Sequence, residues 1–501
     1  MRALLGRDTA LDRAQTAIAA ARQAGADQAE VVIQTEDSGL TRYAGGRVHQ
    51  HVTGCDAEVQ VRAVVGRRVA VARGNQTSPD ALARLGERAT AIARHSAEEP
   101  DFAGLPEPTG GLYVDQTTWY EATAEVGPAE RVRVVTEILD VLAEGGATGY
   151  GVVTNGATEL AVANSLGVHA YQAFTDAWVS VIAELVAAAG PGTRGPSGAG
   201  GAGGAGRVGA RRRASVVPPG DRDTAARRPT GYASSGARDW TSIDPQAAAL
   251  AALTKASTPS VAAVPPGSYL VILEEEAVAE LLLYLAMTAL NGLDFLEGRS
   301  LFSGRLGEKP YPDRITLRDD PTDARGANVS VDFEGVPKGP VTLIREGMLE
   351  QVAWDTARAR RAGERSTGHA LPAPNPYGPV PTNLVLAPGG ASRHELLAQV
   401  DRGLLVTRFH YVNIVDESKT ILTGMTRDGT FLIERGEVVG AVENLRWVES
   451  IDAVLRRTVD VGGVQRLISS GPGYGLRFFE GSLVSPLLVD GFSITGSAEQ
   501  A

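Results

Sequence analysis

The sequence is nearly without cysteine, because Cys55 is the only one among 501 residues. A single cysteine excludes an internal disulfide framework and favours a reducing compartment. The sequence also lacks any run of about 18 uncharged apolar residues, so no membrane-spanning helix is expected. Residues 1–25 are interrupted by charges and predict an amphipathic helix rather than a signal peptide. Together these absences predict a soluble, cytoplasmic protein.

A basic surplus is absent as well. The formal net charge is −11, from 59 acidic and 48 basic residues, which argues against general nucleic-acid binding. Residues 188–230 are the exception, since this Gly- and Arg-rich segment has low complexity and cannot support a packed core. An anion or nucleic-acid tether is one interpretation of its arginines. Because no aromatic residues lie between them and the rest of the chain is acidic, we expect a disordered, solvated insertion and no nucleic-acid partner.

What is present is a mixture of helical and strand patterns. Apolar residues at helical spacing predict helices over about 8–24, 79–95, 127–144, 244–256 and 393–402. Alternating segments at 57–64 and 68–72 predict a β-hairpin. Further short strands are expected at about 29–34, 40–43, 149–153, 158–163, 167–172 and 177–183. Asn155-Gly156 and Asn164–Gly167 are predicted turns between the strands expected at 149–183.

These patterns predict an α+β fold class, with two N-terminal α+β modules followed by a β-rich C-terminal domain. Residues 96–120 are rich in Pro and Gly and indicate a linker. We therefore place the domain boundaries at 1–96, 118–235 and 240–495, with the Gly/Arg-rich insertion inside the central domain.

The stretch Gly267–Asp320 organises the C-terminal part. It opens with the apolar strand Tyr269–Leu273, and Glu274-Glu275-Glu276 follows where a helix begins. Carboxylates suit this position because the N-terminus of a helix carries partial positive charge. The helix is expected to be buried and to run to about Gly292, because apolar residues recur at helical spacing in it, at Val278, Leu281, Leu282 and Leu285.

This strand and helix, with the segment Ser303–Glu308 after them, resemble the TldD/PmbA family. The family's heterodimeric members TldD and TldE form a zinc-dependent peptidase. In TldD-type chains the helix carries HExxxH, whose histidines bind zinc and whose glutamate activates water. Here the middle glutamate is retained as Glu276, but both histidine positions are glutamate, at Glu275 and Glu280. TldD-type chains also use a C-terminal cysteine, and residues 464–501 contain none. The resemblance therefore implies a TldE (PmbA)-like chain without zinc of its own.

Four motifs of the last domain also carry the resemblance. They are Asp332–Pro337, Ser366–Pro372, Pro381–Asn383 and Gly403–Asn413. In the family, such segments line the cleft where peptide binds. The resemblance thus implies a substrate-binding role for Arg365, Ser366, Thr367, Gly368, His369, His410 and Asn413. An ordinary turn remains the alternative for Ser-Thr-Gly.

Glu276 and His410 are the remaining candidates for catalysis by this chain. His410 lies among aromatic and polar residues, where a histidine serves either as an acid/base or metal ligand or as a hydrogen-bonded core or cleft residue. Glu275 and Glu280 are side chains of the kind that hold Mg²⁺ or Ca²⁺. The alternative is that Glu275 only interacts with the partial positive charge at the helix N-terminus, and that Glu280 is a solvated or ion-paired helix residue.

From these observations we expect a non-catalytic subunit of a heterodimeric zinc metallopeptidase that acts in peptide proteolysis or maturation. Zinc is expected in a TldD-like, HExxxH-containing partner, so this chain would be active only with that partner. Peptide is the expected substrate, and no membrane partner is expected. Two alternatives remain: an autonomous metal-dependent hydrolase with a carboxylate site, and a peptide-binding scaffold without catalysis.

Overall fold

The computed structural model describes residues 4–498, apart from 101, 103, 110–116, 187–228, 262, 470, 472–474 and 479. Nearly all of the Gly/Arg-rich insertion predicted at 188–230 lies outside the described residues. Within the described ranges, no helix is long and apolar enough to cross a bilayer.

The first half of the chain is built on one antiparallel sheet of six strands, in the order β3-β2-β1-β4-β5-β6. The strands are β1 (Gln28–Ala44), β2 (Arg47–Val65), β3 (Arg68–Gly74), β4 (Ala147–Asn164), β5 (His169–Leu185) and β6 (Thr230–Ala237). Because β1 pairs with β4 along most of its length, this sheet runs through both of the predicted N-terminal modules.

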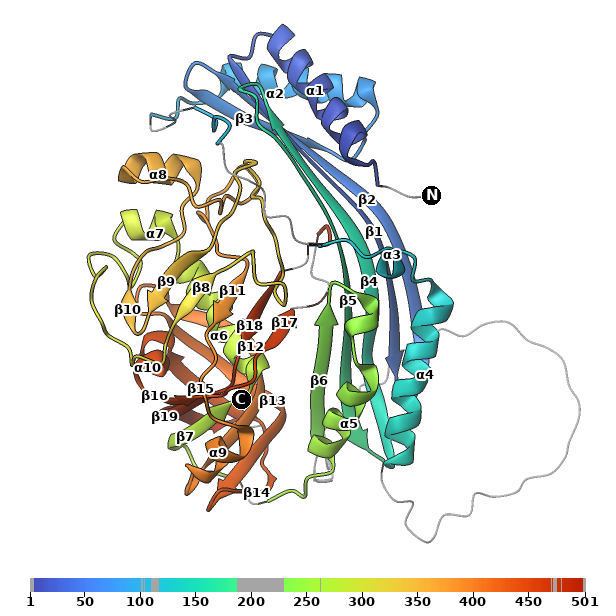
Figure 1. Cartoon of the computed structure of the whole chain (residues 1–501), viewed down its shortest axis with the longest axis vertical. Helices are drawn as coiled ribbons and strands as arrows, with labels where there is room; N and C mark the ends of the chain where they lie inside the picture. The colour runs from blue at the N-terminus through green and yellow to red at the C-terminus, as the bar shows by residue number, and fades with distance from the viewer. Residues whose placement is uncertain are drawn as a thin grey trace, which may run out of the picture.

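Helices cover one face of this sheet, and the C-terminal half lies against the other (Figure 1). Successive strand residues point to opposite faces of the sheet. One face is covered by the helices and the other by the C-terminal half, so alternate residues are buried against different partners. Val31 and Ile33 pack with helix residues, whereas Val32 packs with Val331 of the C-terminal half. The helices of this half are α1 (Arg7–Gln23), α2 (Pro79–His95), α3 (Glu121–Ala124), α4 (Pro128–Glu144), η1 (Trp240–Ser242) and α5 (Pro245–Ala256).

The turn predicted at Asn155-Gly156 is wrong, because both residues lie inside the continuous strand β4. The Asn155 side chain is buried and accepts a hydrogen bond from Arg131 Nη1 at 2.7 Å. Gly156 is needed for a close approach, since a Cβ there would lie 2.4 Å from the Arg477 side chain. The predicted turn at Asn164–Gly167 and the β2–β3 hairpin are confirmed.

The C-terminal half contains a closed ring of strands. Its order is β12-β7-β19-β15-β13, the ring closes where β13 pairs with β12, and β14 also pairs with β13. Phe409, Trp447 and Phe492 pack inside it, with ring centroids 4.5–6.0 Å apart. The strands are β7 (Gly267–Leu273), β12 (Arg402–Asp416), β13 (Ile421–Glu434), β14 (Glu437–Ala441), β15 (Leu445–Ser450), β16 (Thr458–Val461), which pairs with β19, and β19 (Leu487–Ser497).

A second sheet of the C-terminal half has the order β10-β9-β8-β11-β18-β17. It is formed by β8 (Leu317–Asp319), β9 (Val341–Arg345), β10 (Met348–Leu349), β11 (Leu384–Leu386), β17 (Arg466–Ser469) and β18 (Gly481–Val484). The central helix α6 (Glu275–Thr288) packs against both β12 and β18, so it lies between the ring and this sheet. The predicted α+β class with a β-rich C-terminal region is confirmed.

Two helix ends differ from prediction. Helix α6 stops at Thr288 rather than near Gly292, and Gly292 instead begins the short helix α7 (Gly292–Leu296). Helix α9 (Arg393–Ala398) is shorter than predicted, because the strand β12 already begins at Arg402. The remaining helices are α8 (Thr356–Ala362) and α10 (Ile451–Arg456).

Candidate functional site

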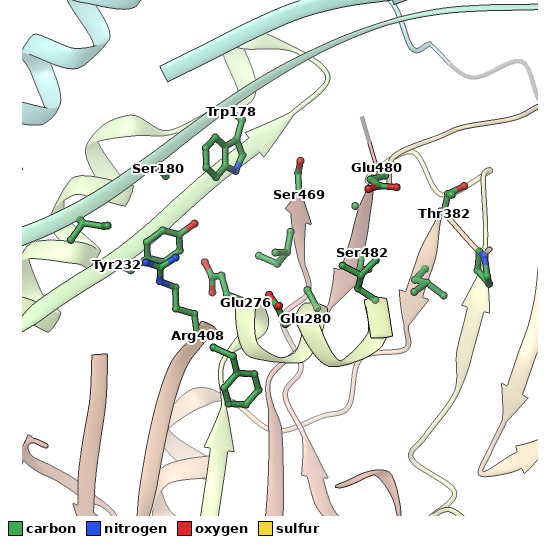
Figure 2. A pocket seen from close by; sticks show the side chains of 18 residues that line it. Trp178, Ser180, Tyr232, Glu276, Glu280, Thr382, Arg408, Ser469, Glu480 and Ser482 are labelled. Carbon is green, nitrogen blue, oxygen red and sulfur yellow. The ribbon is translucent and has the colours of Figure 1, made fainter. Parts of the chain in front are cut away.

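A cavity of about 330 Å³ lies between the N-terminal sheet and helix α6 (Figure 2). Strands β5 and β6 form one wall and α6 forms the opposite wall, while β11, β12, β17 and β18 close the sides. We call this space the α6 cavity. Its size is at the lower end of the range for small-molecule pockets. Its labelled polar residues are Trp178, Ser180, Tyr232, Glu276, Glu280, Thr382, Arg408, Ser469, Glu480 and Ser482.

Ion pairs with neighbouring cations fix the carboxylates at the start of α6. Glu274 contacts Lys255 Nζ at 2.6 Å and Arg393 Nη1 at 2.7 Å. Burial raises the pKa of Glu274, but the two cations more than offset this and lower it to about 2. Glu275 lies 3.4 Å from Arg466, and its pKa is raised because burial outweighs that cation. Glu275 therefore has a structural partner and does not line the cavity.

Glu276 is the carboxylate that enters the cavity from the first turn of α6. Its side chain is 7% exposed, and Oε1 lies 3.5 Å from Arg466 Nη1 and accepts a hydrogen bond from Ser234 Oγ at 3.3 Å. The other oxygen, Oε2, is buried and has no hydrogen-bond partner among the described residues. Glu276 is thus only half satisfied by the protein.

Glu280 and Glu480 line the same cavity. Burial raises the pKa of Glu280, and the Arg408 charge only partly opposes it. Burial likewise raises the pKa of Glu480, opposed by Lys338. Glu280 is half-buried and lies in the cavity wall.

Arg408 supplies positive charge to the wall, but that charge is already matched. Its Nε donates to Asp428 Oδ2 at 3.0 Å, and its guanidinium lies 4.1 Å from the centre of the Tyr232 ring. Asp428 is buried and also accepts a hydrogen bond from Thr230 at 2.7 Å. The carboxylates of the α6 cavity are therefore in excess over its free cations.

His410 is not in the cavity wall, although its neighbours Arg408 and Phe409 are. Its half-buried ring packs 4.4 Å from the Tyr411 ring, and burial together with Arg427 and Arg408 lowers its pKa. Across the described residues, no three His, Cys, Asp or Glu side chains gather as a metal site requires. The structure thus does not assemble Glu275, Glu276, Glu280 and His410 into a metal centre.

The Ser366–Pro372 and Pro381–Asn383 motifs meet at a buried network. The Asp319 carboxylate accepts the backbone N–H groups of Thr382 at 2.8 Å and Asn383 at 2.7 Å. His369 Nε2 lies 3.1 Å from Asp319 Oδ1, and Lys338 Nζ donates to Thr382 Oγ1 at 2.5 Å. We call these five residues the Asp319 network.

The Asp319 network changes the interpretation of the predicted substrate residues. The His369 side chain is fully buried, so it can position its segment but cannot itself touch a ligand. Ser366 and Thr367 donate to the Trp354 carbonyl, and Gly368 is buried. Arg365 and Asn413 are exposed. None of these six predicted substrate residues lines the α6 cavity, whereas Thr382 does.

Sequence reasoning missed most of the cavity wall. Trp178, Tyr232 and Glu480 lie on three segments that come together only in the folded chain. None of them stands in a spacing that signals a site. The available signal was indirect: Arg408 and Thr382 belong to motifs that were singled out, and both are in the wall.

Comparison with known proteins places this arrangement in a family context. Residues 266–496 match the family model described as the PmbA/TldA metallopeptidase C-terminal domain. The chain is 27% identical over 161 residues to a metalloprotease TldD homolog of Haemophilus influenzae, which covers 32% of this chain and 33% of that protein. It is 29% identical over 160 residues to the metalloprotease PmbA of Escherichia coli O157:H7, covering 31% and 33%. The chain therefore aligns with about a third of the length of these relatives.

Structural similarity extends further than sequence similarity. The crystal structure of TldE from Thermococcus kodakarensis superposes with a TM-score of 0.79 at 20% identity, covering 97% of this chain and all of that one. At this identity the likeness concerns the fold alone.

Proposed function

Because the chain belongs to the TldD/PmbA family and has a TldE-like fold, we propose that it is the non-catalytic subunit of a heterodimeric zinc metallopeptidase. The partner would be a TldD-like chain that carries HExxxH and the zinc. The substrate would be a peptide, in proteolysis or peptide maturation.

The observation that carries this proposal is the chemistry at the start of α6. Glu275 and Glu280 stand where TldD-type chains have zinc-binding histidines. Glu275 is engaged by Arg466, and the sole cysteine, Cys55, lies outside the C-terminal domain on β2. A zinc hydrolase needs three protein ligands and an open position for water. The residues that the structure describes do not fit that requirement, so no catalytic step is assigned to them.

In this proposal the chain contributes part of the peptide-binding surface and no catalytic group. Arg365, Ser366, Thr367, Gly368, His410 and Asn413 remain the predicted peptide contacts, with His369 fixing the position of the Ser366–Gly368 segment. An extended peptide is recognised mainly through its backbone, so carbonyl, hydroxyl and guanidinium groups suffice for such contacts.

The test is native mass spectrometry with metal analysis on the tagged protein, purified gently from its own cells. We expect a complex with a second chain of similar size that contains HExxxH, and about one zinc per complex. Peptide hydrolysis should require both chains, and separating them should leave the zinc with the second chain.

Two outcomes contradict the proposal. Stoichiometric metal in the isolated chain, with hydrolysis that survives removal of any partner, would support an autonomous hydrolase. A metal-free assembly of this chain alone that binds peptide without turnover would support a scaffold.

A further inference from the structure

Two buried polar atoms of the α6 cavity lack partners, and they have opposite hydrogen-bonding character. Glu276 Oε2 is an acceptor and Trp178 Nε1 is a donor, and neither has a hydrogen-bond partner among the described residues. Figure 2 shows Trp178 entering from β5 and Glu276 from α6, on opposite sides of the cavity. An unsatisfied buried polar group costs about 1–3 kcal/mol. A ligand that supplies both a donor and an acceptor would recover that cost.

The charge of the α6 cavity wall indicates which kind of hydrogen-bond donor the ligand should carry. Glu276, Glu280 and Glu480 line the cavity, and Arg408 is already paired with Asp428. Within the part of the chain that the structure describes, neither Glu280 nor Glu480 has a cation within 4.0 Å. Glu276 shares Arg466 with Glu275, so within the described residues the three wall carboxylates outnumber the cations that lie within 4.0 Å of them, and this excess favours a ligand that carries positive charge.

An organic cation fits this wall better than a metal ion. The described residues offer no group of three metal-ligating side chains, and Glu276 already shares Arg466 with Glu275. Trp178 presents an aromatic ring to the cavity, and such rings attract ammonium groups. A primary ammonium donates three hydrogen bonds, which suits several carboxylates around one space.

We propose that the α6 cavity binds the free amino terminus of a short peptide, with the ammonium group toward Glu276 and the first carbonyl oxygen toward Trp178 Nε1. An amino-terminal residue carries both a cationic donor, which can pair with Glu276 Oε2, and a neutral acceptor, which can pair with Trp178 Nε1. All of the groups involved belong to this chain, so the site does not depend on a zinc-bearing partner.

The first experiment compares trialanine with N-acetyl-trialanine by isothermal titration calorimetry on the purified full-length chain. We expect trialanine to bind and acetylation to weaken binding at least about tenfold, because it removes the charge and adds bulk at the ammonium position. Equal binding of the two peptides, or no binding of trialanine up to about 10 mM, overturns the proposal.

Variants then locate the site. Glu276→Gln should weaken trialanine binding at least about tenfold, as expected for a lost charge-assisted hydrogen bond. Trp178→Phe should weaken it several-fold. The control is Glu437→Gln, which removes an exposed carboxylate of β14 and should leave binding unchanged. Thermal melting of each variant verifies folding, and wild-type affinity in both folded cavity variants would contradict the assignment.

A third probe separates the two halves of the ligand. Propylamine carries the ammonium group without the carbonyl, so it should bind more weakly than trialanine and be less sensitive to Trp178→Phe, which keeps an aromatic ring but removes the N–H donor. Equal sensitivity of both probes to Trp178→Phe would mean that the indole N–H does not meet a carbonyl. These results are independent of whether a zinc-bearing subunit is found, so either proposal can fail alone.

Discussion

Two buried polar regions of the C-terminal half, the Asp319 network and the α6 cavity, differ in how completely the hydrogen-bonding capacity of their carboxylates Asp319 and Glu276 is satisfied. Asp319 is fully buried, and two backbone N–H groups, the Asn383 amide and His369 surround its carboxylate. Glu276 is nearly as buried, yet one of its oxygens has no hydrogen-bond partner among the described residues. The Asp319 network contributes to stability. The α6 cavity is less stabilising, because its unpaired oxygen remains available to bind a ligand.

The largest effect should come from breaking the satisfied region. Asp319→Asn places an amide N–H₂ against the N–H donors of Thr382 and Asn383 and removes the charge near the buried Lys338. Removing one partner of a buried charged network costs about 3–5 kcal/mol. We expect a loss of that size in urea unfolding. The matched control, Asp313→Asn, changes a carboxylate that is 80% exposed and should have an effect below about 0.5 kcal/mol. Similar losses of unfolding free energy in both variants would contradict the conclusion that the Asp319 network is specially stabilising.

The next effect depends on pH. The pKa of Glu274 is about 2 in the folded protein and about 4.3 in an unfolded chain. Because the folded value is the lower one, its stabilisation is complete above about pH 5 and is lost as pH falls toward 2. Glu274→Gln should therefore cost about 2–3 kcal/mol at pH 7, and the gap to wild type should close in acid. Urea unfolding at pH 7, 5 and 3 measures this, and a gap that stays constant over that range is the contrary result.

A smaller effect is expected for the donor of the α6 cavity. Trp178→Phe removes an indole N–H that has no hydrogen-bond partner among the described residues, so no hydrogen bond is lost with it. Only part of the ring contact disappears, and the loss in unfolding free energy should be about 1 kcal/mol or less. A loss of about 3 kcal/mol would show that Trp178 is a core residue rather than a wall kept open for a ligand.

The smallest effect should be neutral or favourable. Burial raises the pKa of Glu280, so the unfolded chain releases its proton first as pH rises, and the carboxylate costs stability once the pH exceeds both pKa values. Glu280→Gln should then leave stability at pH 8 unchanged or raise it, by less than about 1 kcal/mol. Clear destabilisation at pH 8 would mean that Glu280 has a stabilising partner.

Local patterns predicted the elements better than their arrangement. The β2–β3 hairpin and the strand leading into α6 follow from alternation and helical spacing within a few residues. The continuous strand through Asn155-Gly156 was missed, because the reason for a glycine there is the distant side chain of Arg477. The candidate site has the same limitation. Glu276 was visible from its helix, but nothing near Trp178 in the sequence indicates that its indole faces that carboxylate across a cavity.

Phe409 belongs both to the aromatic core of the strand ring and to the wall of the α6 cavity. Core positions of a closed ring open only rarely, in events that approach global unfolding, so that side of the cavity is fixed on the timescale of ligand exchange. The opposite wall is formed by β5 and by β6, which is the last strand of its sheet. We therefore expect ligand exchange to depend on motions of the β5–β6 wall and of the segments at the sides of the cavity, rather than on the Phe409 side.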